Sequence, residues 1–115
     1  MTTRVRFRLR VTRRADIALG PGKVDLLEAI AKTGSITAAA RALGMSYRRA
    51  WLLVDTMNRC FREPVVYAEK GGKRGGGTRL TTTGVEAVRR YRRVEKRAAR
   101  ASANEIRALL KLLRP

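Results

Sequence analysis

Two helical patterns joined by a very short turn constrain the fold of this chain more than any other feature. Ser35 is a favourable N-cap for a run of small apolar residues that ends at Gly44. After Met45, a second N-cap at Ser46 begins a longer run with apolar residues at helical spacing. These apolar residues are Ala50, Leu53, Val54, Met57 and Phe61. So short a connection makes two helices pack across each other, and the pattern therefore predicts a helix-turn-helix.

Three helices in all are expected over residues 23–62. The first follows the Gly-Pro-Gly break at 20–22 and has apolar residues at helical spacing until Gly34 ends the run. The third extends from Ser46 to about Arg62, because Pro64 disfavours helical conformation in the residue before it. The helix-turn-helix therefore has one further helix in front of it.

A β-hairpin with a basic, glycine-rich tip is expected over residues 65–81. Val65 begins a strand that runs to about Lys70, and residues 78–80 form the returning strand. The tip, 71–77, carries Lys73 and Arg74, and it leads into a strand, whereas a nucleotide-binding P-loop leads into a helix. Two interpretations of the tip stay open: contact with a nucleic-acid backbone or minor groove, or a solvated tip without a partner.

The beginning of the chain alternates between apolar residues and arginines. This period of two predicts a strand over residues 4–11 with one buried and one strongly basic face. Arg6, Arg8 and Arg10 share the basic face, where like charges repel one another unless an anionic group neutralises them. We expect this face to lie near DNA or near acidic groups of a partner chain.

The end of the chain has helical periodicity over residues 82–113. Ser102 and Glu105 have capping-box spacing, so a continuous helix and a helix broken at Ser102 are both open. The leucines beyond the break are poor surface residues for a monomer, and burial in a dimer is favoured over packing back onto the same chain. The candidate dimerisation residues of this segment are Val88, Tyr91, Val94, Ile106, Leu109, Leu110 and Leu113.

Composition excludes several functions. The chain has 27 Lys and Arg against 9 Asp and Glu, a formal net charge of +18 on 115 residues, which favours a polyanionic partner. It has no histidine and a single cysteine, Cys60, so a Cys/His zinc site, a disulfide framework and Ser-His or Cys-His catalysis are excluded. Its longest apolar runs are far shorter than the roughly 20 residues of a membrane-spanning helix. We expect a cytoplasmic, non-enzymatic protein with no cofactor.

The order strand, helix, helix, turn, helix, hairpin, helix defines the expected fold. It is a mainly α winged helix-turn-helix with a small β-hairpin, one domain over residues 1–115 with a long C-terminal helix. In such a fold the start of the third helix enters the major groove of DNA, where Arg48 and Arg49 can pair with guanine. The helix starts at Ser35 and Ser46 can receive phosphates.

Several segments resemble the DNA-binding domain of the molybdate-responsive ModE transcriptional regulators. They include Asp25–Ile30, the run from Thr33 to Ala40, Met57-Asn58 and the turn into the third helix, with its Ser-Tyr-x-x-Ala-Trp start at 46–51. The Gly-Gly-Lys-x-Gly-Gly-Gly tip at 71–77, followed by Leu80-Thr81 and Gly84, is the most specific element. The resemblance is collinear over nearly the whole chain. The helix-turn-helix alone is shared with LysR-type regulators.

The resemblance implies a homodimer on a palindromic operator, with the first strand and the long last helix at the interface. It also implies which residues contact double-stranded DNA. These would be Ser46, Tyr47, Arg48 and Arg49 in the major groove, Lys73 and Arg74 in the wing, and Ser35 and Thr37 at phosphates.

ModE regulators continue into small β-barrel domains that bind molybdate, and nothing in these 115 residues resembles such a domain. Constitutive action, an effector or sensor on a separate partner, and a domain cut from a longer chain are all open.

The sequence therefore predicts a sequence-specific bacterial transcriptional regulator of the nucleoid, ModE-like and linked to molybdenum metabolism. The alternative is a nucleoid-type or RNA-associated basic protein that coats polyanions without reading their sequence, for which the net charge alone would suffice.

Overall fold

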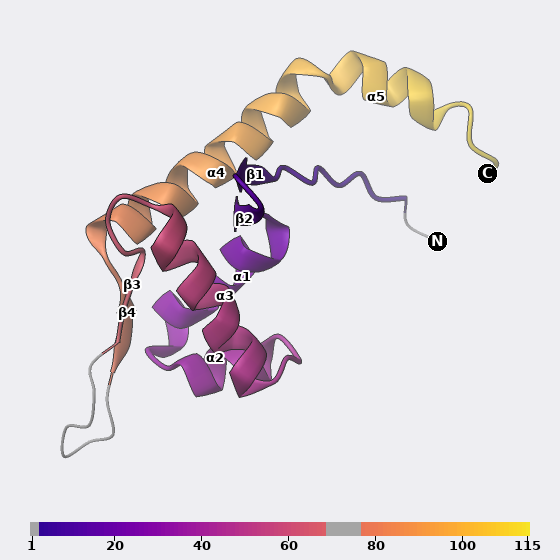
Figure 1. Ribbon diagram of the computed structural model, residues 1–115. Coiled ribbons are helices and arrows are strands. Elements are labelled where there is room, and N and C mark those ends of the chain that lie inside the picture. The colour runs from indigo at the N-terminus through magenta and orange to yellow at the C-terminus, as the bar shows by residue number, and fades with distance from the viewer. Residues whose placement is uncertain (1–2, 69–76) are drawn as a thin grey trace.

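The computed structural model of the chain describes residues 3–68 and 77–115 (Figure 1). It contains two small hairpins and a helical core from which the last helices extend. The elements in chain order are β1 (Val11–Arg13), β2 (Asp16–Leu19), α1 (Pro21–Thr33), α2 (Ile36–Ala42), α3 (Tyr47–Cys60), β3 (Val66–Ala68), β4 (Thr78–Leu80), α4 (Thr82–Ala101) and α5 (Ala103–Leu110). This is the predicted mainly α winged helix-turn-helix with a C-terminal helical segment.

The hydrophobic core lies where α1, α2 and α3 meet the base of the β3–β4 hairpin and the middle of α4. Ala39 and Ala40 of α2 are buried, which lets α3 cross α2 closely. The predicted apolar face of α3 is confirmed, since Ala50, Val54 and Met57 are buried. The largest fully buried side chains are Leu26, Leu27, Ile30, Met57, Val24, Val54 and Val65.

The turn between α2 and α3 has the capping pattern expected from its sequence. The Ser35 Oγ accepts a hydrogen bond from the Ala38 amide, and the Ser46 Oγ accepts one from the Arg49 amide, both at 3.1 Å. Gly44 has a φ of 67°, in the left-handed region that glycine adopts without strain. Two helix starts and the turn between them are therefore specified by local chemistry, and α3 ends two residues before the predicted Arg62.

The predicted strand over residues 4–11 is wrong. Within the described residues, only Val11 of that range lies in a strand, β1, which pairs antiparallel with β2 across a turn at Arg14 that has a positive φ of 55°. Alternation specifies two side-chain faces but supplies no hydrogen-bonding partner, and the partner here comes from residues 16–19. The expected buried face is incomplete in the single chain, because Val5 and Val11 are each 47% exposed.

The last helical segment is broken at Ser102, as one of the two interpretations predicted. The capping box is absent, since no side chain caps the start of α5 and the Ser102 Oγ donates to the Ala98 carbonyl at 2.5 Å. Together α4 and α5 extend away from the helix-turn-helix, and the N-terminal residues before β1 extend toward the same side (Figure 1). The molecule consequently measures 57 × 32 × 24 Å along its principal axes.

Candidate nucleic-acid interface

The start of α3 presents the predicted major-groove residues to solvent. Tyr47, Arg48 and Arg49 form its first turn and are all exposed. Tyr47 packs edge-on against Trp51, with ring centroids 6.2 Å apart and an interplanar angle of 75°. Trp51 keeps 36% of its surface exposed, so the aromatic pair forms part of the outer face of α3.

Acidic residues are absent from this part of the sequence. Residues 29–54, which include all of α2 and the first half of α3, contain no Asp or Glu. Within the described parts of the chain, Arg48 and Arg49 form no ion pair. Positive charge is therefore uncompensated at the start of α3, where an anionic polymer would be attracted.

The N-terminus of α2 carries the two residues predicted to contact phosphates, Ser35 and Thr37. Ser35 is half-buried, and its hydroxyl is engaged in capping α2, whereas Thr37 in the first turn is exposed. Free backbone amides at such a helix start can bind a phosphate. Ser35 thus maintains the helix start, and Thr37 is the side chain available for a contact.

The structure describes the base of the wing, formed by β3 and β4, whereas residues 69–76 of its tip lie outside the described residues. The predicted contacts Lys73 and Arg74 both fall in that tip. At the base, β3 pairs antiparallel with β4, and the Thr78 amide donates to the Gly34 carbonyl at 3.0 Å, which joins the hairpin to the α1–α2 connection. The Arg79 guanidinium lies 5.0 Å from the centre of the Tyr67 ring, a cation–π contact on the exposed side of the hairpin.

Three residues that the sequence analysis gave no structural role hold the wing in place. The Asn58 Oδ1 accepts from the Val65 and Val66 amides at 2.8 and 3.2 Å, and its Nδ2 donates to the Val66 carbonyl at 3.2 Å. The Thr81 Oγ1 donates to the Pro64 carbonyl at 2.5 Å and also caps α4. Gly84 approaches the Val65 carbonyl so closely that an added Cβ would lie 2.1 Å from its oxygen. All three residues were part of the motifs that carry the family resemblance.

Asn58, Thr81 and Gly84 thereby connect α3, the β3–β4 hairpin and α4 through contacts with backbone atoms. Such contacts fix the base of the hairpin relative to α3 and α4.

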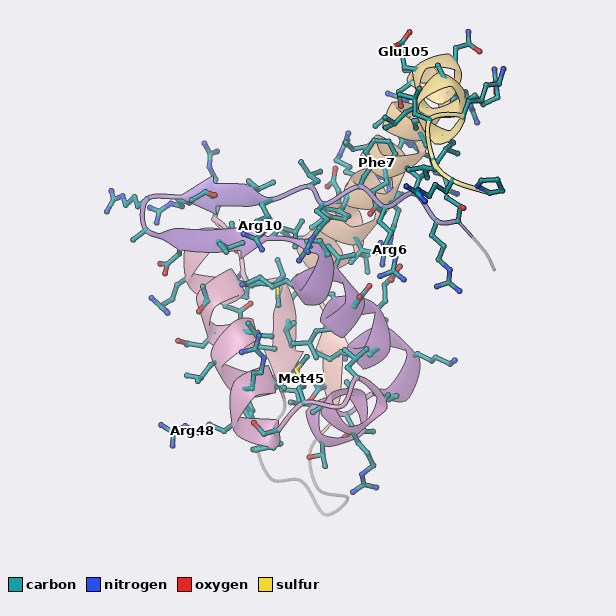
Figure 2. The ribbon with its side chains drawn as sticks, turned by 90° about the vertical axis from the view of Figure 1, so that its right-hand side faces the viewer. Arg6, Phe7, Arg10, Met45, Arg48 and Glu105 are labelled. Carbon is teal, nitrogen blue, oxygen red and sulfur yellow. The ribbon has the colours of Figure 1, made fainter. Side chains whose placement is uncertain are left out.

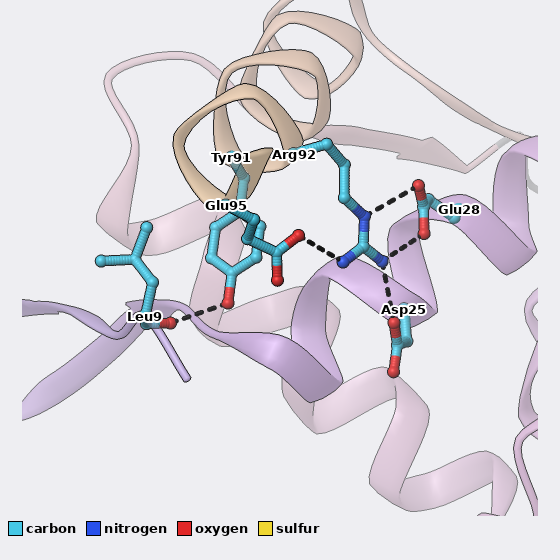
Figure 3. Close-up of polar contacts among 6 residues, drawn as sticks. All are labelled: Leu9, Asp25, Glu28, Tyr91, Arg92 and Glu95. Atoms are coloured by element: carbon cyan, nitrogen blue, oxygen red, sulfur yellow. Dashed lines mark hydrogen bonds and ion pairs between the residues drawn. The ribbon is translucent and has the colours of Figure 1, made fainter. Parts of the chain in front are cut away.

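The candidate dimerisation residues divide into one buried residue and several accessible ones. Tyr91 is only 3% exposed, and its hydroxyl donates to the Leu9 carbonyl at 2.8 Å (Figure 3). The structure therefore accounts for Tyr91 within its own chain. Three others are strongly exposed: Val94 at 48%, Leu109 at 61% and Leu113 at 55%. Three are half-buried: Val88, Ile106 and Leu110.

An ion-pair cluster, comprising Arg92, Asp25, Glu28 and Glu95, joins α4 to α1 (Figure 3). The Arg92 guanidinium contacts carboxylate oxygens of Asp25 at 2.9 Å, Glu28 at 2.5 Å and Glu95 at 2.9 Å. The hydrogen bonds from Arg92 lower the pKa of the Glu28 carboxyl, and those carboxylates, Glu28 foremost, raise the pKa of Arg92. Because the partners lie 64 and 67 residues apart, periodicity could not reveal the cluster.

None of the helices in residues 3–68 and 77–115 combines the length and apolar character that crossing a membrane requires.

A helix-turn-helix with a capped, basic recognition helix and a wing anchored beside it defines the class of winged-helix DNA-binding proteins. A family profile described as "Bacterial regulatory helix-turn-helix protein, lysR family" matches residues 22–85, more than half of the chain. The chain belongs to this family.

Curated relatives confirm the resemblance to the ModE regulators. The chain is 43% identical over 95 residues to the molybdenum transport protein ModE of Azotobacter vinelandii, covering 81% of this chain and 35% of that protein. It is 44% identical over 90 residues to the molybdenum-pterin-binding protein MopB of Rhodobacter capsulatus, covering 78% and 33%. It is 38% identical over 71 residues to the DNA-binding transcriptional dual regulator ModE of Escherichia coli K12, covering 62% and 27%. The chain thus spans about a third of the length of these relatives or less.

Proposed function

We propose that the chain is a sequence-specific, double-stranded DNA-binding transcriptional regulator and not an enzyme. The acid-free start of α3 carries this proposal, because it presents Tyr47, Arg48 and Arg49 on a helix whose N-terminus is capped by Ser46. Arg48 is assigned to the bases of the major groove, where an arginine fork pairs with guanine O6 and N7, and Arg49 to the DNA surface beside it. Thr37 and the α2 start are assigned to backbone phosphates, and Lys73 and Arg74 to the wing contact.

The proposed functional unit is a homodimer on a palindromic operator. Val94, Leu109 and Leu113 support it, since the first two are exposed apolar side chains on α4 and α5, which extend away from the core, and exposed Leu113 lies just after α5. A pocket of about 740 Å³ between the N-terminal residues and α4–α5 is lined in part by Phe7 and Ile106, which adds apolar surface on the same side. A two-fold symmetric dimer places two α3 helices on successive major grooves, so the operator repeats in inverted orientation.

We further propose a link to molybdenum, because the names of the relatives from Azotobacter vinelandii and Rhodobacter capsulatus refer to molybdenum transport or molybdenum-pterin binding. The site of action is the bacterial cytoplasm at the nucleoid.

Selection of bound duplexes from a random pool tests the proposal. The expected result is an enriched palindrome whose half-sites lie about one helical turn, 10–10.5 base pairs, apart or at a multiple of it. Analytical ultracentrifugation of the complex should give two chains per operator. Recovery of sequences no different from the starting pool would instead support the nucleoid-type or RNA-associated coating protein, which the net charge of +18 alone favours.

A further inference from the structure

A second basic feature lies next to α3, in a pocket of about 250 Å³ that the N-terminal residues, the start of α1 and α3 form together. We call it the α1–α3 pocket. Arg8, Arg10, Lys23 and Arg49 supply its charged lining, and none of its lining residues, among those that the structure describes, is acidic. Figure 2 shows Arg10 above Met45, another lining residue, and Arg48 farther down at the start of α3.

Four cations around one concave surface repel one another unless an anion lies between them. The pKa of Lys23 is lowered in this environment, mainly because the side chain is partly buried. The positive charges of Arg49 and Arg10 lower this pKa further, whereas Cys60 and Asp16 act to raise it. The N-terminus of α1 adds positive electrostatic potential to the pocket. Gly20 at its N-cap has no side chain to accept hydrogen bonds from the first-turn amides, which therefore stay uncapped. The pocket is therefore complementary to a compact anion with several acceptor oxygens.

The position of the pocket identifies the source of that anion. Arg49 belongs both to the pocket and to the first turn of α3, directly after Arg48. A helix inserted in the major groove has a phosphate backbone on each side, and one of them passes beside the residues next to its base-reading positions.

We propose that the α1–α3 pocket binds a phosphate of the DNA backbone, with Arg10, Lys23 and Arg49 as its ligands. The proposal rests on the DNA-binding function proposed above and divides the two arginines of α3. Arg48 reads bases, whereas Arg49 moves to the phosphate-binding set. The N-terminal residues then contribute to DNA binding through Arg10 even though they form no strand there.

Methylphosphonate scanning of the selected operator tests the proposal directly. Each duplex carries one neutral methylphosphonate in place of one phosphodiester, and affinities are measured by fluorescence anisotropy for the wild type and for the Arg10→Gln/Lys23→Gln variant. In the wild type, one position flanking each half-site should lose roughly tenfold in affinity on neutralisation. In the variant that position should become insensitive, while the other sensitive positions keep their effects.

The Arg100→Gln/Lys111→Gln variant is the matched control, because it removes the same charge from exposed residues at the end of α4 and after α5. It should retain the full set of sensitive positions. On unmodified operator, Arg10→Gln/Lys23→Gln should reduce the salt slope by about 1 per phosphate lost, with the ratio of operator to random affinity unchanged.

Two results would overturn the pocket assignment while leaving the proposed function intact. One is an unchanged methylphosphonate profile in Arg10→Gln/Lys23→Gln. If that variant had nevertheless lost saturable binding of inorganic phosphate by the DNA-free protein, the pocket would belong to a free anion. The other is the same altered profile in the control variant. Absence of any enriched operator would instead overturn the proposed function itself.

Discussion

Arginine has opposite surroundings at the two ends of the helical core. At the α1–α4 junction, the Arg92 side chain is only 32% exposed and contacts three carboxylates, two of them on α1. At the start of α3, Arg48 and Arg49 are exposed and, within the described residues, form no ion pair. The same side chain therefore stabilises the fold in one region and remains available for a ligand in the other.

The difference shows that net charge alone does not locate the functional surface. In residues 3–68 and 77–115, six acidic residues pair with arginines around α1, α4 and the end of α3, namely Asp16, Asp25, Glu28, Asp55, Glu86 and Glu95. This placement leaves the first turn of α3 as a region of uncompensated positive charge. Substitutions at the junctions should change stability, whereas substitutions at the start of α3 should change DNA binding.

Gly84→Ala should have the largest effect of any single substitution at the junctions. The new Cβ would lie 2.1 Å from the Val65 carbonyl oxygen, so either β3 or the start of α4 must move. We expect a loss of about 3 kcal/mol or more in the free energy of unfolding, measured by urea denaturation. Gly22→Ala is the control, because a Cβ there meets nothing within 4 Å and helix propensity favours alanine. Equal stabilities of the two variants would contradict the close approach at Gly84.

Arg48→Ala should act on the other region. We expect a loss of about 1–3 kcal/mol in binding free energy on the operator, a smaller loss on random DNA and an unchanged melting temperature. Lys73→Ala should weaken binding to both duplexes alike, as a backbone contact does. The measurement is fluorescence anisotropy with both duplexes. Equal losses on the two duplexes for Arg48→Ala would remove Arg48 from base reading.

Arg92→Met should lower stability and leave the base preference intact. Removal of the guanidinium leaves Asp25, Glu28 and Glu95 to repel one another. We expect a loss of about 1–2 kcal/mol in the free energy of unfolding, since nearly a third of the Arg92 side chain is exposed to solvent and its ion pairs are partly screened. Arg90→Met, which breaks a more exposed pair with Glu86, should have no resolvable effect. If both variants were equally stable, the cluster would contribute nothing.

The pH dependence of stability should show the smallest effect. The Arg92 hydrogen bonds lower the pKa of Glu28 below its ordinary 4.5, so its contribution is complete above that pH and is lost as pH falls through the lower folded-state pKa. The stability difference between wild type and Glu28→Gln should be constant above about pH 5 and shrink below 4.5. Urea unfolding at several pH values measures this difference. A difference that stayed constant down to pH 3 would exclude ionised Glu28 as a source of stability.

The parts of the fold predicted from the sequence are those that local chemistry determines. Ser35, Gly44 and Ser46 specify two helix starts and a turn within twelve residues, and all three have the expected roles. The strand over residues 4–11 was wrong because a strand requires a partner, and alternation could not indicate whether one exists. The turn at Arg14 that creates β1 and β2 has no glycine to mark it.

For the candidate site, the sequence identified exposed residues but not their supports. Arg48 was accessible to sequence reasoning because it follows a cap at a helix start. The roles of Asn58 and Gly84 depend on contacts with Val65, whose position relative to α3 and α4 is a property of the packed chain. The α1–α3 pocket could not be predicted from the sequence for the same reason, since its cationic side chains come from three separate segments.

The ratio of affinities for a selected operator and a random duplex of equal length, measured at about 150 mM salt, tests the central claim most directly. If the uncompensated start of α3 reads base sequence, the wild-type ratio should be about 10³ or more, and Arg48→Ala should reduce it at least roughly tenfold. A wild-type ratio near one would contradict the account, because the positive charge of the chain would then bind DNA without reading it.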